Sequence, residues 1–156
     1  MNVTFCGHSK LSQTGQISQW LDSILPSLIE GGAETFYIGS YGDFDRLAAA
    51  AVRRQKHTYP HIESILVLAY PHRAIDTSCY DGTTYPPLET VPPRYAIAKR
   101  NEWMVCKSDI VVSCVTHGWG GAAKTLGCAK RQGKVIVQFP TRGESASADA
   151  SAESLH

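Results

Sequence analysis

Short apolar runs alternate along this chain with longer stretches of helical periodicity, and this alternation constrains the fold more than any other feature. The apolar runs are residues 3–6, 36–38, 65–69, 110–115 and 135–137. Between them, residues 17–29 and 44–52 repeat apolar side chains every three or four positions, which is typical of amphipathic helices. Strands that alternate with helices predict a parallel sheet with right-handed crossovers. The sequence therefore predicts an α/β, Rossmann-like three-layer domain with a mostly parallel sheet of five or slightly more strands.

Two features interrupt this alternation. Pro26 lies inside the first predicted helix, where the missing N–H and the ring should kink the helix or divide it. Residues 71–93 contain five of the eight prolines and are too long for an ordinary connection between elements. We expect this segment to be either a lid over a site or a floppy insertion.

The length of 156 residues suits one domain with a full core. Residues 143–156 are acidic and of low complexity, so we expect a disordered tail after a domain that spans residues 1–142. That domain has 15 Lys and Arg residues against 11 Asp and Glu residues, a net charge of +4. A charge of this size suits a pocket for one or two phosphates better than a nucleic-acid-binding surface.

The sequence also indicates where the protein acts and what it lacks. It has no apolar run near 18 residues, and its first residues lack the basic and apolar regions of a secretion signal, so we expect a cytoplasmic protein without a membrane partner. The five cysteines are odd in number and never spaced CxxC, which favours buried, reduced thiols over a disulfide framework. No zinc site can be assembled from the histidines, so neither a metal nor a cofactor is expected.

Three glycine-containing turns follow predicted strands, at residues 7–9, 39–43 and 118–125. In an open parallel sheet, ligands bind beyond the carboxyl ends of the strands, where helix N-termini offer free N–H groups. Glycine lets the backbone approach a phosphate closely, and hydroxyl groups add donors. The candidate ligand-binding residues in these turns are Gly7, His8, Gly39, Ser40, Gly118, Trp119, Gly120, Gly121 and Thr125. A tight strand-to-helix turn without a ligand is the alternative for each turn taken alone.

Neither of the common nucleotide-binding motifs fits these turns. The third turn is not a P-loop, because its Lys124-Thr125 follows Gly121-Ala122-Ala123 and not GxxxxG. The first turn lacks the GxGxxG pattern, so ordinary binding of NAD is not expected. A nucleotide site of a family that uses neither motif remains as an interpretation of these turns.

A longer pattern resembles a known family. Residues 94–112 contain RY, RNEWMV and SDIVV, and residues 120–136 contain GGA, TL and GKVI. Together with FCGH at 5–8 and the segment from Gly39 to Asp45, this pattern resembles the YpsA-like branch of the SLOG superfamily over residues 3–138. The resemblance implies a Rossmann-like fold and a nucleotide or nucleotide-derived ligand. Relatives include Lonely-Guy-type phosphoribohydrolases, the DNA-processing proteins of transformation and ligand-sensing domains of bacterial antiphage systems.

The sequence departs from the Lonely-Guy-type motif at its catalytic position. That motif is PGGxGTxxE, in which the Glu beside the phosphate-binding glycines assists cleavage of an N-glycosidic bond. Aligned on Gly121, this chain has Ala122 in place of the Thr and Thr125 in place of the Glu. Arg100 matches the Arg on the preceding helix and implies a catalytic or ligand-binding role. A hydrolase would need Glu102 or Asp45 to replace the lost carboxylate.

The charged candidates have structural alternatives. Arg100 and Glu102 are two positions apart, so they point to different faces of a helix and one of them can be a solvated charge. Asp45 either holds a ribose hydroxyl or caps the helix after Gly42, a role for which Asp43 competes.

The ring-bearing candidates also have two interpretations. His8 and His117 each follow a strand, where a histidine either donates a proton to a phosphate or bonds to the backbone. Trp119 lies between glycines and is either a stacking surface or a loop anchor, whereas Trp103 is expected to pack on the sheet. Cys6 and Cys114 lie in or at the end of predicted strands, where burial raises the pKa of a thiol and makes it inert, which disfavours a Cys–His nucleophile pair.

Three functions are therefore considered. The first is binding of a nucleotide-like ligand, with its phosphate on residues 118–122, its ribose near Ser40 and Asp45 and its base beneath residues 71–93. The second is N-glycosidic hydrolysis of a nucleoside monophosphate, and the third is binding of single-stranded DNA, against which the modest charge argues. The superfamily resemblance implies a homodimer, for which the Ala-rich face of residues 47–52 is a candidate surface.

Overall fold

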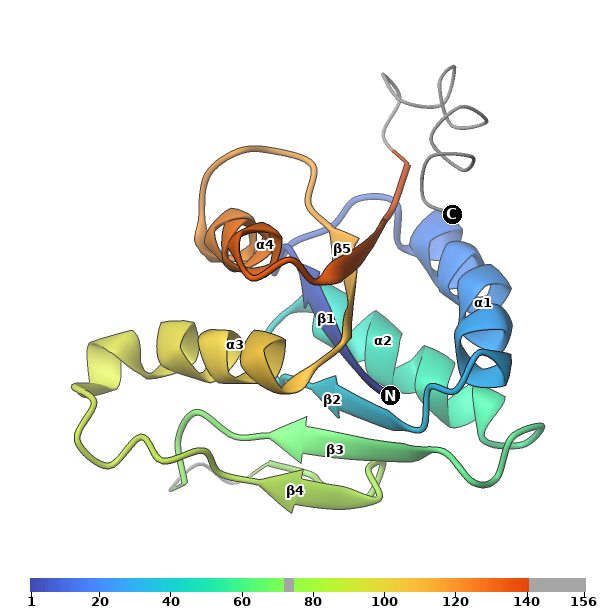
Figure 1. Ribbon diagram of the computed structural model, residues 1–156, viewed down its shortest axis with the longest axis horizontal. Coiled ribbons are helices and arrows are strands. Elements are labelled where there is room, and N and C mark those ends of the chain that lie inside the picture. Colours follow the sequence, from blue (N-terminus) through green and yellow to red (C-terminus); the bar gives the residue numbers. More distant parts are fainter. Residues whose placement is uncertain (72–74, 141–156) are drawn as a thin grey trace.

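The computed structural model describes residues 1–71 and 75–140, and within them six parallel strands form one sheet between two pairs of helices (Figure 1). The strand order is β4-β3-β2-β1-β5-β6. The strands are β1 (Asn2–Gly7), β2 (Thr35–Ile38), β3 (Glu63–Val67), β4 (Gly82–Thr84), β5 (Ile110–Cys114) and β6 (Val135–Gln138). The helices are α1 (Thr14–Glu30), α2 (Asp43–Gln55), the 3-10 helix η1 (Pro93–Tyr95), α3 (Ala96–Lys107) and α4 (Gly121–Arg131). The predicted Rossmann-like three-layer fold is confirmed.

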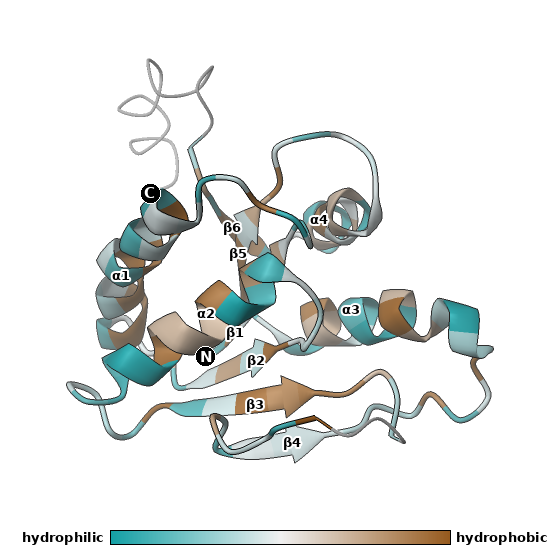
Figure 2. Ribbon diagram, turned by 180° about the vertical axis from the view of Figure 1, so that it is seen from behind, coloured by the Kyte–Doolittle hydropathy of each residue, from teal (hydrophilic) through white to brown (hydrophobic). Residues whose placement is uncertain are grey.

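Alternation along the strands supplies a core on each face of the sheet. Val3 and Phe5 of β1 belong to the larger apolar cluster, which α1 and α2 complete, whereas Cys6 belongs to a smaller cluster with residues of α3 and α4. Side chains two positions apart share a face of a strand, so this division follows directly from the sequence. Figure 2 shows β3 as a polar start followed by a continuous apolar stretch.

Helix α1 runs unbroken from Thr14 to Glu30 with Pro26 inside it, so the predicted division of this helix is wrong. The buried stripe of Ile17, Leu21, Leu25 and Ile29 extends over both sides of the proline. This stripe packs both halves of the helix on the sheet, and its burial outweighs the local cost of the missing N–H.

The sixth strand lies inside residues 71–93, which the sequence assigned to a lid or an insertion. β4 pairs with β3 in register, with Gly82 opposite Ile65. The Asp81 carboxylate accepts the Ser64 N–H at 2.8 Å and forms an ion pair with Lys56, and these contacts hold the start of β4. A strand of sequence GTT has no apolar run, so hydrophobic patterning could not reveal it. The sheet is larger than the five strands that the apolar runs indicated.

The Ala-rich face of α2 packs inside the molecule. Ala48, Ala51 and Val52 are buried in the larger cluster. The surface suggested for a second copy of the chain is thus already covered by the sheet, and that basis for a homodimer is wrong. The homodimer itself stays a prediction.

The expectations for the acidic tail and for a membrane span concern the ends of the chain and the length of its helices. The predicted acidic tail at 143–156 lies outside the described residues. Among those that are described, no helix combines the length and apolar character needed to cross a membrane.

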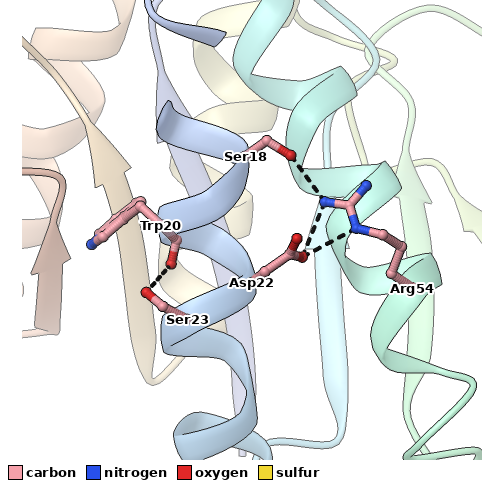
Figure 3. Close-up of polar contacts among 5 residues, drawn as sticks. All are labelled: Ser18, Trp20, Asp22, Ser23 and Arg54. Atoms are coloured by element: carbon pink, nitrogen blue, oxygen red, sulfur yellow. Dashed lines mark hydrogen bonds and ion pairs between the residues drawn. The ribbon is translucent and has the colours of Figure 1, made fainter. Parts of the chain in front are cut away.

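A polar cluster joins α1 to α2 at the surface (Figure 3). The Arg54 guanidinium donates to the Asp22 carboxylate from Nε at 3.1 Å and from Nη2 at 3.0 Å, and Nη2 also reaches Ser18 Oγ at 3.1 Å. The side chains of Arg54 and Asp22 are 45% and 41% exposed, so water competes with the ion pair. Such pairs contribute about 0–1 kcal/mol, and apolar burial therefore carries the α1–α2 packing.

We predict that Leu25→Ala lowers the free energy of unfolding by about 2–5 kcal/mol, because it leaves a cavity in the core. Arg54→Ala should lower it by less than about 1 kcal/mol. Urea denaturation of both variants measures the difference. Equal losses of unfolding free energy in the two variants would contradict the conclusion that apolar burial outweighs the surface ion pair.

Candidate functional site

The sheet has a topological switch point between β1 and β5. The chain proceeds outward from β1 through β2 and β3 to β4, and then returns to the other side of β1 to form β5 and β6. Gly7 at the end of β1 lies opposite Cys114 at the end of β5. The connections to α1 and α4 leave these neighbouring ends toward opposite faces of the sheet (Figure 1), which opens a crevice where ligands bind in folds of this kind.

A cavity of about 410 Å³ occupies this crevice. Eight of the residues predicted to bind a ligand line it, although they come from four separate segments of the chain. These residues are Gly7, His8, Asp45, Arg100, Trp119, Gly120, Gly121 and Thr125. The structure thus brings most of the candidates to one place, while Gly39, Ser40, Gly118 and Glu102 lie outside the lining of this cavity.

The N-terminus of α4 forms one wall of the cavity. Gly120 precedes the helix with φ of +93°, a backbone conformation that favours glycine. Gly121 begins the helix, and a Cβ at this position would meet no atom within 4 Å. The first-turn N–H groups of a helix have no acceptor within it, and they carry its positive dipole end. The start of this helix thus lines the cavity, and its wall is free of side-chain bulk at Gly121.

Thr125 has a different role from the one expected. Its Oγ1 donates to the carbonyl of Gly121 at 2.9 Å, one turn earlier on α4. The hydroxyl hydrogen is therefore used within the helix, and Thr125 does not supply the additional donor for an anion that the sequence suggested.

Arg100 places a buried positive charge against the cavity. Its side chain comes from α3 and is only 3% exposed. Nε and Nη2 both donate to Asn101 Oδ1, at 3.2 and 2.9 Å. Burial lowers the pKa of the Arg100 guanidinium, and the charge of Asp45 opposes this shift. An arginine remains protonated at neutral pH, so Arg100 is a fixed cation in a poorly hydrated place.

Asp45 lies beside Arg100 and is held by the backbone. Burial raises the pKa of the Asp45 carboxyl, whereas Arg100 and a hydrogen bond from the Tyr41 N–H at 2.9 Å lower it. Gly39 packs behind this pair, since a Cβ there would lie 2.7 Å from Asp45 Oδ2 and 2.9 Å from Arg100 Nη2. Glycine at position 39 therefore allows the acid and the guanidinium to approach each other at the cavity wall.

The capping alternative for Asp45 is wrong, because the N-cap residue of α2 is Gly42 and the Asp45 carboxylate accepts the Tyr41 N–H. Asp43 is also used elsewhere. Its carboxylate accepts the Leu11 N–H at 2.9 Å and pairs with Arg46. Asp43 thereby fixes the loop that follows β1, and Asp45 remains available to the cavity.

Three aromatic rings form a column along another wall. The rings of His8 and His117 are stacked with centroids 3.7 Å apart and planes 11° apart. The rings of His117 and Trp119 are stacked at 3.8 Å and 23°. His8 follows β1 and the other two follow β5, so the pairing of these strands assembles the column. Trp119 at its outer end is 70% exposed.

A backbone hydrogen bond fixes the inner end of the column. The Thr116 N–H donates to His8 Nε2 at 2.9 Å, so this nitrogen carries no proton. Burial and the nearby His117 lower the pKa of His8, which keeps the imidazole neutral at neutral pH. Of the two interpretations of His8, the bond to the backbone is the one observed. His117 Nδ1 is shielded from solvent and has no partner among the described residues, so ring contacts determine its position.

The remaining candidates line two neighbouring hollows. Glu102 is exposed on α3, forms an ion pair with Lys99 at 3.2 Å, and lines a groove of about 580 Å³ between α3 and α4, as Gly118 does. Ser40 lines a smaller cavity of about 210 Å³, whose described lining includes Ile75. Arg100 lines this smaller cavity as well as the larger one.

Sequence reasoning missed several residues of the cavity. Asn101 orients the Arg100 guanidinium, Tyr41 lines both cavities through the loop after β2, and Lys10 adds a cation at the loop after β1. Lys10 directly follows the first glycine turn, so extending that turn by one residue would have found it, whereas Tyr41 lies within the second turn and was passed over there. Among residues 1–71 and 75–140, no group of three His, Cys, Asp or Glu side chains lies in position to hold a metal ion.

The predictions for the thiols and for Trp103 have mixed outcomes. Burial raises the pKa of Cys6 to about 12 and that of Cys114 to about 11, which confirms that these thiols are inert. Cys79 and Cys106 are exposed, so the expectation that all five are buried is wrong. Trp103 packs edge-on against Tyr37 of β2 at 5.5 Å, as expected.

Comparisons with known proteins give a likeness in structure but not in sequence. No protein-family model matches the chain, and no curated protein matches it either. A structure of DNA processing protein A from Helicobacter pylori, described for its single-stranded DNA binding mode, has a TM-score of 0.65 at 16% identity and covers 91% of this chain. A molybdenum cofactor binding protein from the phototrophic bacterium Rippkaea orientalis has a TM-score of 0.61 at 16% identity and covers 99% of this chain.

These likenesses show the fold. This chain spans 66% of the DNA processing protein structure and 85% of the cofactor binding protein. Both neighbours support the Rossmann-like fold that the sequence predicted.

We predict that acidification destabilises the protein through His8. The pKa of His8 is lowered in the folded state, whereas the unfolded chain binds a proton near the usual pKa of about 6.5. The stability that neutral His8 contributes is present above about pH 6.5 and is lost as the pH falls toward the folded pKa. Urea denaturation at about pH 7.5 and about pH 5.5 should show a smaller loss for His8→Gln than for the wild type.

The matched control is His57→Gln, which changes an exposed histidine outside the cavity lining. It should keep the wild-type pH dependence. An unchanged pH dependence in His8→Gln would contradict the assignment of neutral His8.

Proposed function

We propose that the 410 Å³ cavity binds a small nucleotide-like ligand through a phosphate group. The observation that carries this proposal is the meeting of Arg100 with the N-terminus of α4 across one cavity at the switch point of the sheet. In this arrangement the phosphate lies on Gly120 and Gly121, and the sugar lies toward Asp45.

The charges of the cavity support an anionic ligand. Arg100 is buried, and a buried cation is costly unless an opposite charge or several hydrogen bonds compensate it. Asn101 offers a neutral oxygen, and burial raises the pKa of Asp45 and so weakens its ionised form. Phosphate oxygens at the cavity would stabilise the guanidinium, and Lys10 adds a second cation there. The helix N-terminus supplies N–H donors for the same group.

The comparisons support ligand binding in general without naming the ligand. One structural neighbour is described as binding single-stranded DNA and the other as binding a molybdenum cofactor. Single-stranded DNA binding by this chain draws on the first likeness, but the net charge of +4 over residues 1–142 favours a small ligand. A small phosphorylated ligand fits the volume and the sparse charge of the cavity.

N-glycosidic hydrolysis is a second candidate because of one observation. Asp45 is the carboxylate among the described residues that line the cavity, and its raised pKa is a property of general acids. Glu102 lies in the α3–α4 groove and is paired with Lys99, so it is a poor replacement for the missing Glu. Thr125 stands at the position of that Glu and cannot act as an acid or base near neutral pH.

We predict that Gly121→Asp abolishes binding of nucleoside monophosphates, because a carboxylate would project beside the N–H groups that receive the phosphate. The substitution should not impair folding, since a Cβ at position 121 has open space and an acidic residue suits a helix N-terminus. Calorimetric titration with AMP, GMP, CMP and UMP measures the affinity.

Two control variants separate the effect of a negative charge at position 121 from the effects of side-chain bulk and of the net charge of the protein. Gly121→Ala should keep most of the affinity, because it adds a methyl group and no charge. Gly15→Asp places the same charge in open space at the start of α1, outside the lining of the cavity, and should bind as the wild type does. Undiminished affinity in Gly121→Asp would remove the α4 N-terminus from the site.

We also predict that the wild type releases little or no free base from these nucleotides, because a positioned acid or base group contributes about 10²–10⁴ in rate and the motif Glu is replaced by Thr125. A chromatographic assay with equimolar protein over hours tests this, with Asp45→Asn and Glu102→Gln alongside. Rapid release that disappears in Asp45→Asn would favour the hydrolase.

A further inference from the structure

We infer that the ligand of the proposed site carries a planar heteroaromatic ring, and that this ring stacks on the open face of Trp119 as a fourth member of the column formed by His8, His117 and Trp119. The inference rests on the proposed function and adds the part of the ligand that the phosphate site does not define. It places the ring outside the smaller cavity that Ser40 and Ile75 line.

The inner rings of the column, those of His8 and His117, are held in place by contacts within the protein. His8 is held by the Thr116 N–H, and the three rings follow one another at 3.7 and 3.8 Å. The small angles between successive planes, 11° and 23°, keep the indole of Trp119 nearly parallel to the rings behind it. A further ring placed on the indole would continue the column at the same spacing.

Trp119 is not part of the hydrophobic core, so packing does not explain a tryptophan at this position. It is 70% exposed and lies between Gly118 and Gly120, which offer it no side-chain contact. One face of the indole rests on His117, and the residue lines the 410 Å³ cavity. A ring that covers the other face removes apolar surface of both partners from water.

The column is also adjacent to the proposed phosphate site. Trp119 directly precedes Gly120 and Gly121, where the backbone N–H groups receive the phosphate. A ligand that holds a phosphate on Gly121 and a ring on Trp119 is therefore short, with the two groups joined by a sugar-sized spacer. A nucleoside monophosphate carries a phosphate and a ring on one sugar, so it offers both contacts within one molecule.

The smaller cavity is a less suitable place for the ring. Its described lining contains no residue of the α4 N-terminus and consists of Ser40, Tyr41, Ala69, Tyr70, Ile75, Ile97 and Arg100. Arg100, Tyr41 and Ile97 border both cavities. Trp119, Gly120 and Gly121 line the larger cavity and not the smaller one, so a ring on Trp119 and a phosphate on the α4 N-terminus occupy the same cavity.

The chemistry of the column defines a class of ring and not one base. The imidazole of His8 is neutral, since burial and His117 lower its pKa. The indole of Trp119 can stack on any nucleobase, because each base has a π-face. Purine and pyrimidine nucleotides should therefore all gain affinity over the same sugar phosphate without a base.

The experiment compares AMP, GMP, CMP and UMP with ribose 5-phosphate by calorimetric titration of the full chain. The wild type should bind the tightest nucleotide about 5- to 150-fold more strongly than ribose 5-phosphate. Trp119→Ala should lose most of this ratio and bind ribose 5-phosphate as the wild type does. Trp119→Phe should retain most of the ratio, because it keeps an aromatic face.

The matched control is Ile75→Ala, which alters the smaller cavity and not the larger one. It should leave both affinities unchanged. Because Trp119 is exposed, thermal melts should show that Trp119→Ala, Trp119→Phe and Ile75→Ala all fold. If Trp119→Ala does not fold, Trp119→Phe keeps the test valid.

Four results would overturn the inference. Wild-type affinity for the nucleotides in Trp119→Ala, or a loss that falls on Ile75→Ala instead, would place the ring elsewhere. Equal binding of ribose 5-phosphate and all four nucleotides would remove the ring while leaving the proposed phosphate site intact. Absence of binding for all five compounds would overturn the proposed function, and the stacking with it.

Discussion

The parallel pairing of β1 with β5 is the constraint on which the rest of the molecule depends. It joins residues 3–7 to residues 110–114 in continuous register, although more than a hundred positions separate them in the chain. The loops that follow the two strands start side by side and then lead to opposite faces of the sheet. The bond between the Thr116 N–H and His8, the ring column and the cavity all follow from this one pairing.

The cavity also depends on the buried charge of Arg100. Arg100 is bonded to the amide oxygen of Asn101, and Asp45 beside it has a pKa that burial raises. Gly39 permits this arrangement because any side chain there would collide with both groups. A buried cation, a helix N-terminus and a stack of aromatic rings together favour a ligand with an anionic end and a planar end.

The sequence predicted the features that depend on local pattern. The apolar runs located the five longer strands, and glycines after the strands located the turns that surround the cavity. It missed β4, because three residues of sequence GTT show no periodicity. It also predicted that Pro26 kinks or divides α1, whereas the helix is not divided, because the packing of the Ile17–Ile29 stripe on the sheet is a tertiary effect that outweighs the local one.

Other parts of the site could not be predicted because they depend on contacts between distant residues. The stacking of His8 on His117 needs the register of β1 and β5, and the support of Arg100 by Asn101 needs side-chain geometry. Helical phase placed Arg100 and Glu102 on different faces, but only the packing of α3 shows that Arg100 is the buried one.

The central claim is that a phosphorylated ligand binds in the crevice between β1 and β5. Nuclear magnetic resonance of the ¹⁵N-labelled protein, titrated with the four nucleoside monophosphates, tests it at individual groups. The account predicts that the amide signals of Gly120 and Gly121 and the indole signal of Trp119 shift together, while those of Gly31 and Gly32 at the end of α1 stay in place. Shifts confined to residues outside the lining of the 410 Å³ cavity, or no shifts at all, would contradict it.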